Sequence, residues 1–197
     1  MTIEQDIAAL EPSTPLATVA ASRHDEELTT YSGFAFDVRP ADVDDEDALA
    51  EFFAHVTKED LRFRFLSAMQ TVSHAQLTLL THPDHRQTEN FLAMAKGTGS
   101  ILASAMLAAD DDMKSAEVAI VIRPEYKGRG IGWRLLQHLS EYAVDMGIGT
   151  LRSIESSDSR AAIEVEREMG FVSRACPGDA TLVILEKSLR SQPATGV

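Results

Sequence analysis

The chain has 197 residues, 44% of them hydrophobic and 25% charged, which is an ordinary composition for one soluble domain with a sizeable core. Its 31 acidic and 18 basic side chains give a formal net charge of −13, which argues against nucleic acid and against an anionic membrane as the main partner. The single cysteine, Cys176, excludes an internal disulfide and fits a reducing cytoplasm, where we expect the protein to work.

The N-terminal third is predicted to hold an arm, one strand and a helix. Residues 1–33 lack clear periodicity, so we expect an arm there, with a short helix from Glu4 to Leu10. Apolar and polar residues alternate from Phe34 to Arg39, which predicts a half-buried strand that Pro40 ends. The acidic run from Asp42 to Glu51 fits the N-terminus of a helix better than a cation-binding loop.

Two capping-box patterns, Thr57 with Asp60 and Ser73 with Gln76, predict short helices over LRFRFL and AQLTLL. The histidines His82 and His85 then flank a proline turn. No Cys or Glu pattern completes a ligand set there, so we interpret the segment as a loop and predict no metal site.

The middle of the chain predicts an antiparallel meander. Strands are expected over Asn90 to Lys96, Ser100 to Ala109 and Ser115 to Ile122, with turn residues between them. The longest nearly apolar run lies in the second of these and is too short to span a bilayer. A glycine-rich turn, RPEYKGRGIG, follows the third strand, and an amphipathic helix from Ile131 to Met146 follows the turn.

A strand from Thr150 to Glu155 must be reached by a crossover, which predicts that it pairs in parallel with the strand before the turn. A helix from Arg160 to Met169 is expected next, then strands beginning at Phe171 and Thr181. We expect residues 188–197 to form a disordered tail.

The glycine-rich turn carries a local excess of positive charge. Arg123, Lys127, Arg129 and Arg134 stand there against one acid, Glu125. Basic side chains at a helix N-terminus oppose the helix dipole, so an anionic ligand explains them better than helix stability does. A tight strand–helix turn alone would account for the glycines, but it would leave the charge unexplained.

Three kinds of nucleotide loop can be compared with this turn. A Walker loop needs Gly-Lys-Ser/Thr, and a dinucleotide fingerprint needs a third glycine, but Trp133 follows Gly130-Ile131-Gly132 in both alignments. The pyrophosphate loop of acyl-CoA-dependent N-acyltransferases fits the turn and the order of elements on both sides of it.

From about Phe34 to Lys187 the chain resembles the GNAT superfamily of N-acetyltransferases. The family signature Gln/Arg-x-x-Gly-x-Gly/Ala is matched by Lys127 to Gly132, with lysine at the first position. A second signature, an Asn-led helix ending in Gly-Phe, is matched from Ser159 to Phe171, with serine in place of asparagine. The segments LRFRF, AEVAIVI and GRGIG look most like the acetyltransferase domain of bacterial protein-lysine acetyltransferases.

The resemblance implies an α/β (α+β) fold: a mixed, mostly antiparallel sheet of six to seven strands with about four helices and a parallel strand–helix–strand crossover at the coenzyme A (CoA) site. The domain would span residues 34–187. The expected reaction is acetyl transfer from acetyl-CoA, a co-substrate, to a primary amine of a protein lysine or a small molecule. Transfer would be direct, in a ternary complex, without metal, and the resemblance leaves room for a homodimer.

The resemblance also assigns residues to the cofactor. Backbone amides of the strand would pair with the pantetheine arm, the glycine-rich turn would hold the pyrophosphate, and the serine at the family's asparagine position would keep a weaker hydrogen bond. These residues are Ile120, Val121 and Ile122; Lys127, Gly128, Arg129, Gly130, Ile131, Gly132 and Trp133; and Ser159.

Glu117 is the candidate catalytic base. It is the only charge in the strand from Ala116 to Ile122, and alternation places it on the same face as Ala119 and Val121. Burial in an apolar strand would raise the pKa of a carboxyl towards neutral pH, and the resemblance also puts a catalytic glutamate in this strand. The alternative is an exposed position or a structural ion pair.

The general acid is not identified. Many family members have a tyrosine five residues before the Phe of Gly-Phe, and this chain has Glu166 there. Tyr126, Ser157 or solvent could replace the tyrosine. The missing tyrosine and the serine at position 159 keep a second function open, that of a non-catalytic acyl-CoA-binding regulatory module.

Overall fold

Eight strands form one sheet in the computed structural model, which describes residues 26–65 and 71–189. The strands are β1 (Glu26–Thr29), β2 (Ala35–Pro40), β3 (Thr88–Ala95), β4 (Ile101–Ala109), β5 (Ser115–Ile122), β6 (Thr150–Ser156), β7 (Val172–Cys176) and β8 (Asp179–Ser188). They lie in the order β1-β2-β3-β4-β5-β6-β8-β7, and every neighbouring pair is antiparallel except β5–β6. The mixed sheet and its parallel crossover are confirmed, with more strands than the six to seven predicted.

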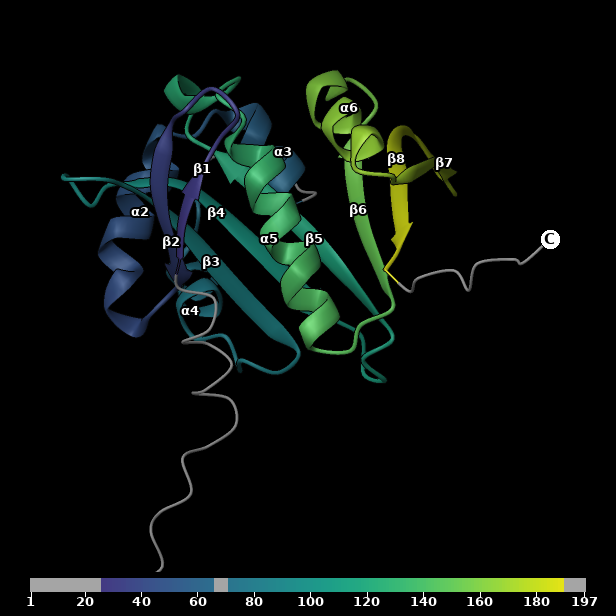
Figure 1. The fold of residues 1–197 in the computed structure, drawn as a ribbon, viewed down its shortest axis with the longest axis horizontal. Coiled ribbons are helices and arrows are strands. Elements are labelled where there is room, and N and C mark those ends of the chain that lie inside the picture. Colours follow the sequence, from purple (N-terminus) through teal and green to yellow (C-terminus); the bar gives the residue numbers. More distant parts are fainter. Residues whose placement is uncertain (1–25, 66–70, 190–197) are drawn as a thin grey trace, which may run out of the picture.

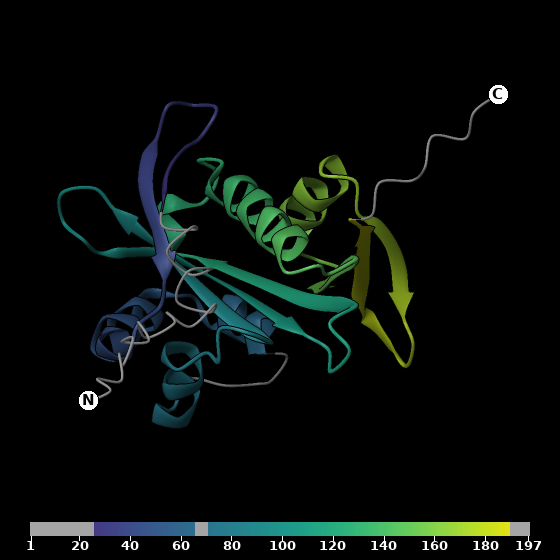
Figure 2. The ribbon, with the colours of Figure 1, turned by 60° about the horizontal axis from the view of Figure 1, so that its bottom comes forward.

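Helices cover both faces of the sheet (Figure 2). On one face lie α5 (Ile131–Asp145) and α6 (Arg160–Glu168); on the other lie α2 (Glu46–His55), α3 (Lys58–Phe65) and α4 (His74–Thr81). Two 3-10 turns, η1 (Val43–Asp45) and η2 (Pro124–Tyr126), precede α2 and α5. The described residues thus hold five α-helices, where about four were predicted.

Each face of the sheet has its own apolar core. Under α5 and α6, Leu135 and Leu139 are fully buried against strand residues such as Phe91. Under the other helices, Leu49 and Phe52 of α2 are fully buried in a second cluster. Helices therefore pack on both faces of the sheet, which is how an α/β domain buries the two faces of its strands.

The predicted helix starts are found. Ser73 and Gln76 form a reciprocal capping box at α4, and the Asp60 amide donates to Thr57 Oγ1 at 3.1 Å at the start of α3. In the acidic run, Asp42 caps η1, and the carboxylate of Asp45 accepts two hydrogen bonds of 2.6 Å from Arg39. These acids anchor a helix start, as the sequence indicates.

Strand β1 was not predicted. It lies within residues 1–33, which we expected to form an arm, and it pairs antiparallel with β2. Its sequence, EELT, buries only Leu28, so no alternation marks it as a strand. The expected helix from Glu4 to Leu10 and the tail beyond Leu189 lie outside the described residues.

The loop with His82 and His85 is held by its own side chains. Asp84 Oδ1 accepts hydrogen bonds from the amides of Arg86, Gln87 and Thr88, and His85 Nδ1 lies 2.9 Å from Glu89 Oε2.

Within residues 26–65 and 71–189, no helix is long and apolar enough to cross a membrane.

Candidate active site

Strands β5 and β6 form a fork in the sheet. They pair over three residues only, from Ser115 with Thr150 to Glu117 with Arg152. Beyond Glu117 the two strands diverge, as Figure 1 shows, although β5 runs on to Ile122 and β6 to Ser156. The fork exposes strand backbone in the middle of the sheet, where a ligand can pair with it.

A cavity of about 490 Å³ occupies the fork and reaches both faces of the sheet. Its walls include Leu136 of α5 and Glu166 of α6 from one face, and Asp60 and Arg64 of α3 from the other. Ligand cavities in proteins are typically about 300–1,000 Å³. Two substrates entering from opposite faces could meet at the fork.

The glycine-rich turn forms one wall of this cavity. Gly130 precedes α5 with φ of +84°, and a Cβ there would lie 3.3 Å from Thr30 Cβ. A Cβ on Gly132 would lie 3.2 Å from Ile122 Cδ1. The positive φ of Gly130 and the two close approaches favour glycine at the start of α5 beside β5, where helix amides without intrahelical partners can bind a phosphate. The turn therefore fits the pyrophosphate of CoA.

The cavity brings together all but one of the cofactor residues expected from the resemblance. It is lined by Ile120, Val121, Ile122, Lys127, Gly128, Gly130, Ile131, Gly132, Trp133 and Ser159. Arg129 does not line it. Its guanidinium lies over the rings of Phe34 and Tyr126 instead, 5.4 and 5.0 Å from their centroids.

The positive charge of the turn is partly balanced within the protein. Arg123 forms an ion pair with Glu51 of α2, and Lys127 Nζ lies 2.6 Å from Asp60 Oδ1 of α3. These partners are distant in sequence, which is why the local composition overstated the excess of charge. An anionic ligand must compete with Asp60 for Lys127.

Glu117 lies at the base of the fork, on the face of β5 that carries α3. Its side chain is exposed, so the burial that the sequence argument assumed is absent. Arg64 is its basic neighbour in the cavity: burial lowers the pKa of Arg64 to about 10, and the Glu117 charge opposes that shift. Arg64 also donates to Met106 Sδ at 3.1 Å.

Two carboxyl groups that we did not predict as a pair line the same cavity. Glu155 of β6 and Glu166 of α6 both face the fork, and Ser153 Oγ donates to Glu166. Burial, and then the charge of Glu166, raises the pKa of Glu155 to about 8. Burial raises the pKa of Glu166 to about 7, against the hydrogen bond from Ser153.

Because Glu166 is buried, we expect the protein to lose stability as the pH rises. The pKa of the Glu166 carboxyl is 4.5 in the unfolded chain and about 7 in the folded protein. Between these values the folded protein keeps a proton that the unfolded chain has lost, so the free energy of unfolding falls as the pH rises from 4.5 to about 7. At about 1.36 kcal/mol per pH unit, the Glu166 share is roughly 2–4 kcal/mol. Urea unfolding at pH 5.5 and pH 9 should show that Glu166→Gln loses less stability than the wild type.

The exposed residue Glu164 on the same helix provides the control, and Glu164→Gln should follow the wild type. An equal loss of stability in wild type and Glu166→Gln would contradict the burial argument.

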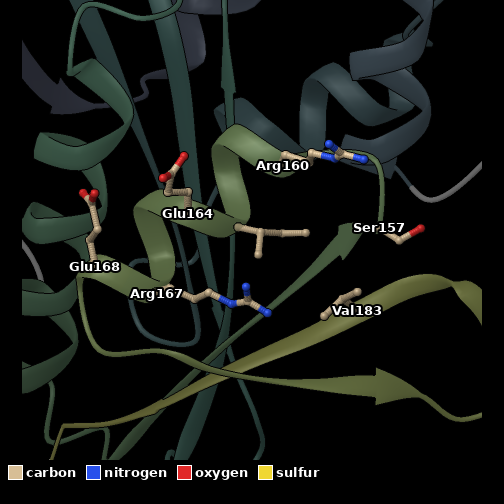
Figure 3. A pocket seen from close by; sticks show the side chains of 7 residues that line it. Ser157, Arg160, Glu164, Arg167, Glu168 and Val183 are labelled. Carbon is tan, nitrogen blue, oxygen red and sulfur yellow. The ribbon is translucent and has the colours of Figure 1, made fainter.

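A second pocket, of about 580 Å³, lies outside the fork between α6 and β8. Figure 3 shows its lining, with Arg160, Glu164, Arg167 and Glu168 projecting from α6, and Val183 on β8. It shares only Arg160 with the cavity in the fork. Of the candidate residues named from the sequence it contains only Ser157, which therefore does not line the fork as a general acid would.

Comparison with known proteins agrees with this geometry. The model of the acetyltransferase (GNAT) family matches residues 50–171. An acetyltransferase of Pseudomonas aeruginosa is 28% identical over 149 residues, which are 75% of this chain and 80% of that protein. The GNAT domain of S. lividans PAT has a TM-score of 0.78 at 23% identity, over 85% of this chain and 98% of that one.

The yncA protein of Salmonella typhimurium, solved with its cofactor acetyl-CoA, has a TM-score of 0.65 at 19% identity. The match covers 82% of this chain and 98% of that one. At these identities the solved structures support the fold, whereas the family model covers most of the chain, including the fork and the glycine-rich turn. This chain is therefore a member of the acetyltransferase (GNAT) family, and it is an acyltransferase.

Proposed function

We propose that the protein transfers the acetyl group of acetyl-CoA to a primary amine, on a protein lysine or a small molecule, by direct transfer in a ternary complex. The observation that carries the proposal is the cavity in the β5–β6 fork, which joins the glycine-rich turn on one face to Glu117 on the other. Bound acetyl-CoA would supply an activated thioester.

Each wall of the cavity has a role in this reaction. Amides from Gly128 to Trp133 would hold the pyrophosphate. Ile120 to Ile122 of β5 pair with β4 on one side but not with β6 on the other, and that open side would bind the pantetheine arm. Ser159 is the N-cap residue that precedes α6, and its side chain makes no capping hydrogen bond, so it can bind the ligand instead.

Glu117 would accept the proton of the attacking amine, directly or through a water. Its exposed carboxylate lies where the acceptor would enter from the α3 side, beside Asp60 and Arg64. The net charge of −13 favours a cationic acceptor.

Direct transfer is supported by the absence of a thiol from the cavity walls. Cys176 lies on β7, at the edge of the sheet and separated from β6 by β8. No cysteine lines the described cavity, so a covalent acetyl-thiol intermediate has no residue to form on.

The Lys127–Asp60 ion pair leads to a prediction for CoA affinity. Asp60→Asn would release Lys127 for the pyrophosphate, while the asparagine oxygen can still accept the hydrogen bond from Thr57. A partly exposed ion pair of this kind is worth about 0.2–1 kcal/mol, so the Kd for CoA should fall about 1.5- to 5-fold. Calorimetry on Asp60→Asn, with the neighbouring exposed Glu59→Gln as control, measures this, and unchanged or weaker binding would contradict it.

The proposed function is tested by mixing the protein with acetyl-CoA and a panel of amines and lysine-containing proteins. Release of free CoA thiol that depends on the amine supports acetyl transfer. CoA binding by calorimetry with no turnover on any acceptor would instead indicate the non-catalytic regulatory module.

A further inference from the structure

Two carboxyl groups from different elements share the fork with the expected thioester. Glu155 lies on β6 beyond the last residue that pairs with β5, and Glu166 lies on α6. Ser153, which shares its strand face with Glu155, donates its hydroxyl to Glu166 and so fixes that carboxyl against β6. Glu166 is 6% exposed, and Glu155 is half-buried.

The other charged groups of the cavity do not neutralise this pair. On the far side, Arg64 faces Glu117, and Lys127 is paired with Asp60. Asp158 of the β6–α6 connection and Arg160 at the start of α6 add one acid and one base. The α5 residues in the lining do not titrate. Burial and the neighbouring Glu166 carboxylate raise the pKa of Glu155, and burial raises the pKa of Glu166. Among the described residues, no basic group opposes either of these pKa shifts.

Two such carboxylates cannot both ionise easily. Taking a carboxylate out of water is costly, and a second negative charge nearby adds to the cost, so one of the two keeps its proton at neutral pH. The charge of Glu166 raises the pKa of Glu155, so the two groups titrate together. The cavity lining contains no tyrosine, so the pair is its best-placed weak acid.

We propose that the Glu155–Glu166 pair holds one proton at neutral pH and donates it to the sulfur of CoA as the acetyl group leaves. This inference rests on the proposed acetyl transfer. As the C–N bond forms and the C–S bond breaks, the sulfur takes the bonding electrons. The pair then passes its O–H proton to the sulfur, which leaves CoA as a thiol and the pair as two carboxylates. Solvent returns one proton to the pair before the next turnover.

The acidity of the pair suits the task. A thiol has an ordinary pKa of about 8.5, and a general acid works best when its own pKa lies near the working pH. The native pKa values of Glu166 and Glu155, about 7 and about 8, lie near neutral pH and below that of the thiol, so either carboxyl can give its proton to the thiolate.

The test compares Glu155→Gln, Glu166→Gln and the double variant with Glu164→Gln, an exposed glutamate of α6 that lines the second pocket (Figure 3). Glutamine keeps the size of the side chain but cannot donate an acidic proton. The double variant Glu155→Gln/Glu166→Gln should lower kcat for acetyl transfer about 100-fold at pH 7, a typical effect of losing general acid catalysis, and leave the Kd for CoA within about threefold. Each single variant keeps one buried carboxyl and should lose less of the rate. Glu164→Gln should keep the wild-type rate.

Infrared spectroscopy gives a second readout that does not depend on turnover. The protein without CoA should show a protonated carboxyl band at pH 7, which Glu164→Gln retains and the double variant Glu155→Gln/Glu166→Gln loses. No such band in the wild type, or a rate in the double variant close to that of the wild type, would overturn the proton donor while acetyl transfer stands. If CoA binds and no amine is acetylated, the proposed function itself fails and the donor role fails with it.

Discussion

Replacing Gly130 with glutamate is expected to weaken CoA binding about 100-fold, a loss of about 2.7 kcal/mol. The residue has a φ of +84°, and a Cβ would lie 3.3 Å from Thr30 Cβ, so the turn must shift at the mouth of the cavity. The new carboxylate would also stand beside amides that we assign to the pyrophosphate, where it competes for the same donors. Calorimetric titration with CoA measures the effect.

Gly99→Glu is the matched control. Gly99 also has a positive φ, of +66°, in the turn between β3 and β4, and nothing lies within 4 Å of the place where its Cβ would be. The control therefore carries a similar backbone strain outside the cavity and should bind CoA as the wild type does. A change of less than about threefold in Gly130→Glu would show that the glycine-rich turn does not hold the ligand.

Glu117→Gln should slow acetyl transfer about 100- to 1,000-fold without changing the Kd for CoA. Glutamine fills the same space at the base of the fork but cannot accept the proton of the amine. Initial rates of CoA thiol release across a pH series, with calorimetry for binding, separate the two effects. Glu59→Gln, an exposed glutamate on α3, is the control and should keep the wild-type rate.

A Glu117→Gln rate equal to the wild-type rate at every pH would show that Glu117 is not the base. Glu117 is exposed, so burial does not prepare it to act as a base. Its role rests instead on its position, beside Arg64 and at the place where the acceptor would bind.

The elements that the sequence predicted well are those whose signals are local. The glycines at positions 128, 130 and 132, and the strand before them, carry their geometry in neighbouring residues, so the turn and its cavity wall could be anticipated. Strand β1 escaped prediction because it is four residues long and buries one side chain, Leu28. Its place in the sheet is set by pairing with β2 rather than by its own pattern.

Contacts between distant segments could not be predicted. Lys127 meets Asp60 across 67 residues, and Arg129 turns to Phe34 and Tyr126, so a charge count over the turn did not reveal which cations face the cavity. Glu166 was recognised only as a replacement for the family's tyrosine. Its pairing with Glu155 arises because α6 packs over β6, which no local pattern encodes.

The most direct test is a crystal structure of the protein with CoA. We expect the pyrophosphate at the amides of Gly128 to Trp133, the pantetheine arm along Ile120 to Ile122, and the sulfur inside the β5–β6 fork, within reach of Glu166. CoA bound in the outer pocket between α6 and β8, or with its sulfur outside the fork, would contradict acetyl transfer at this site.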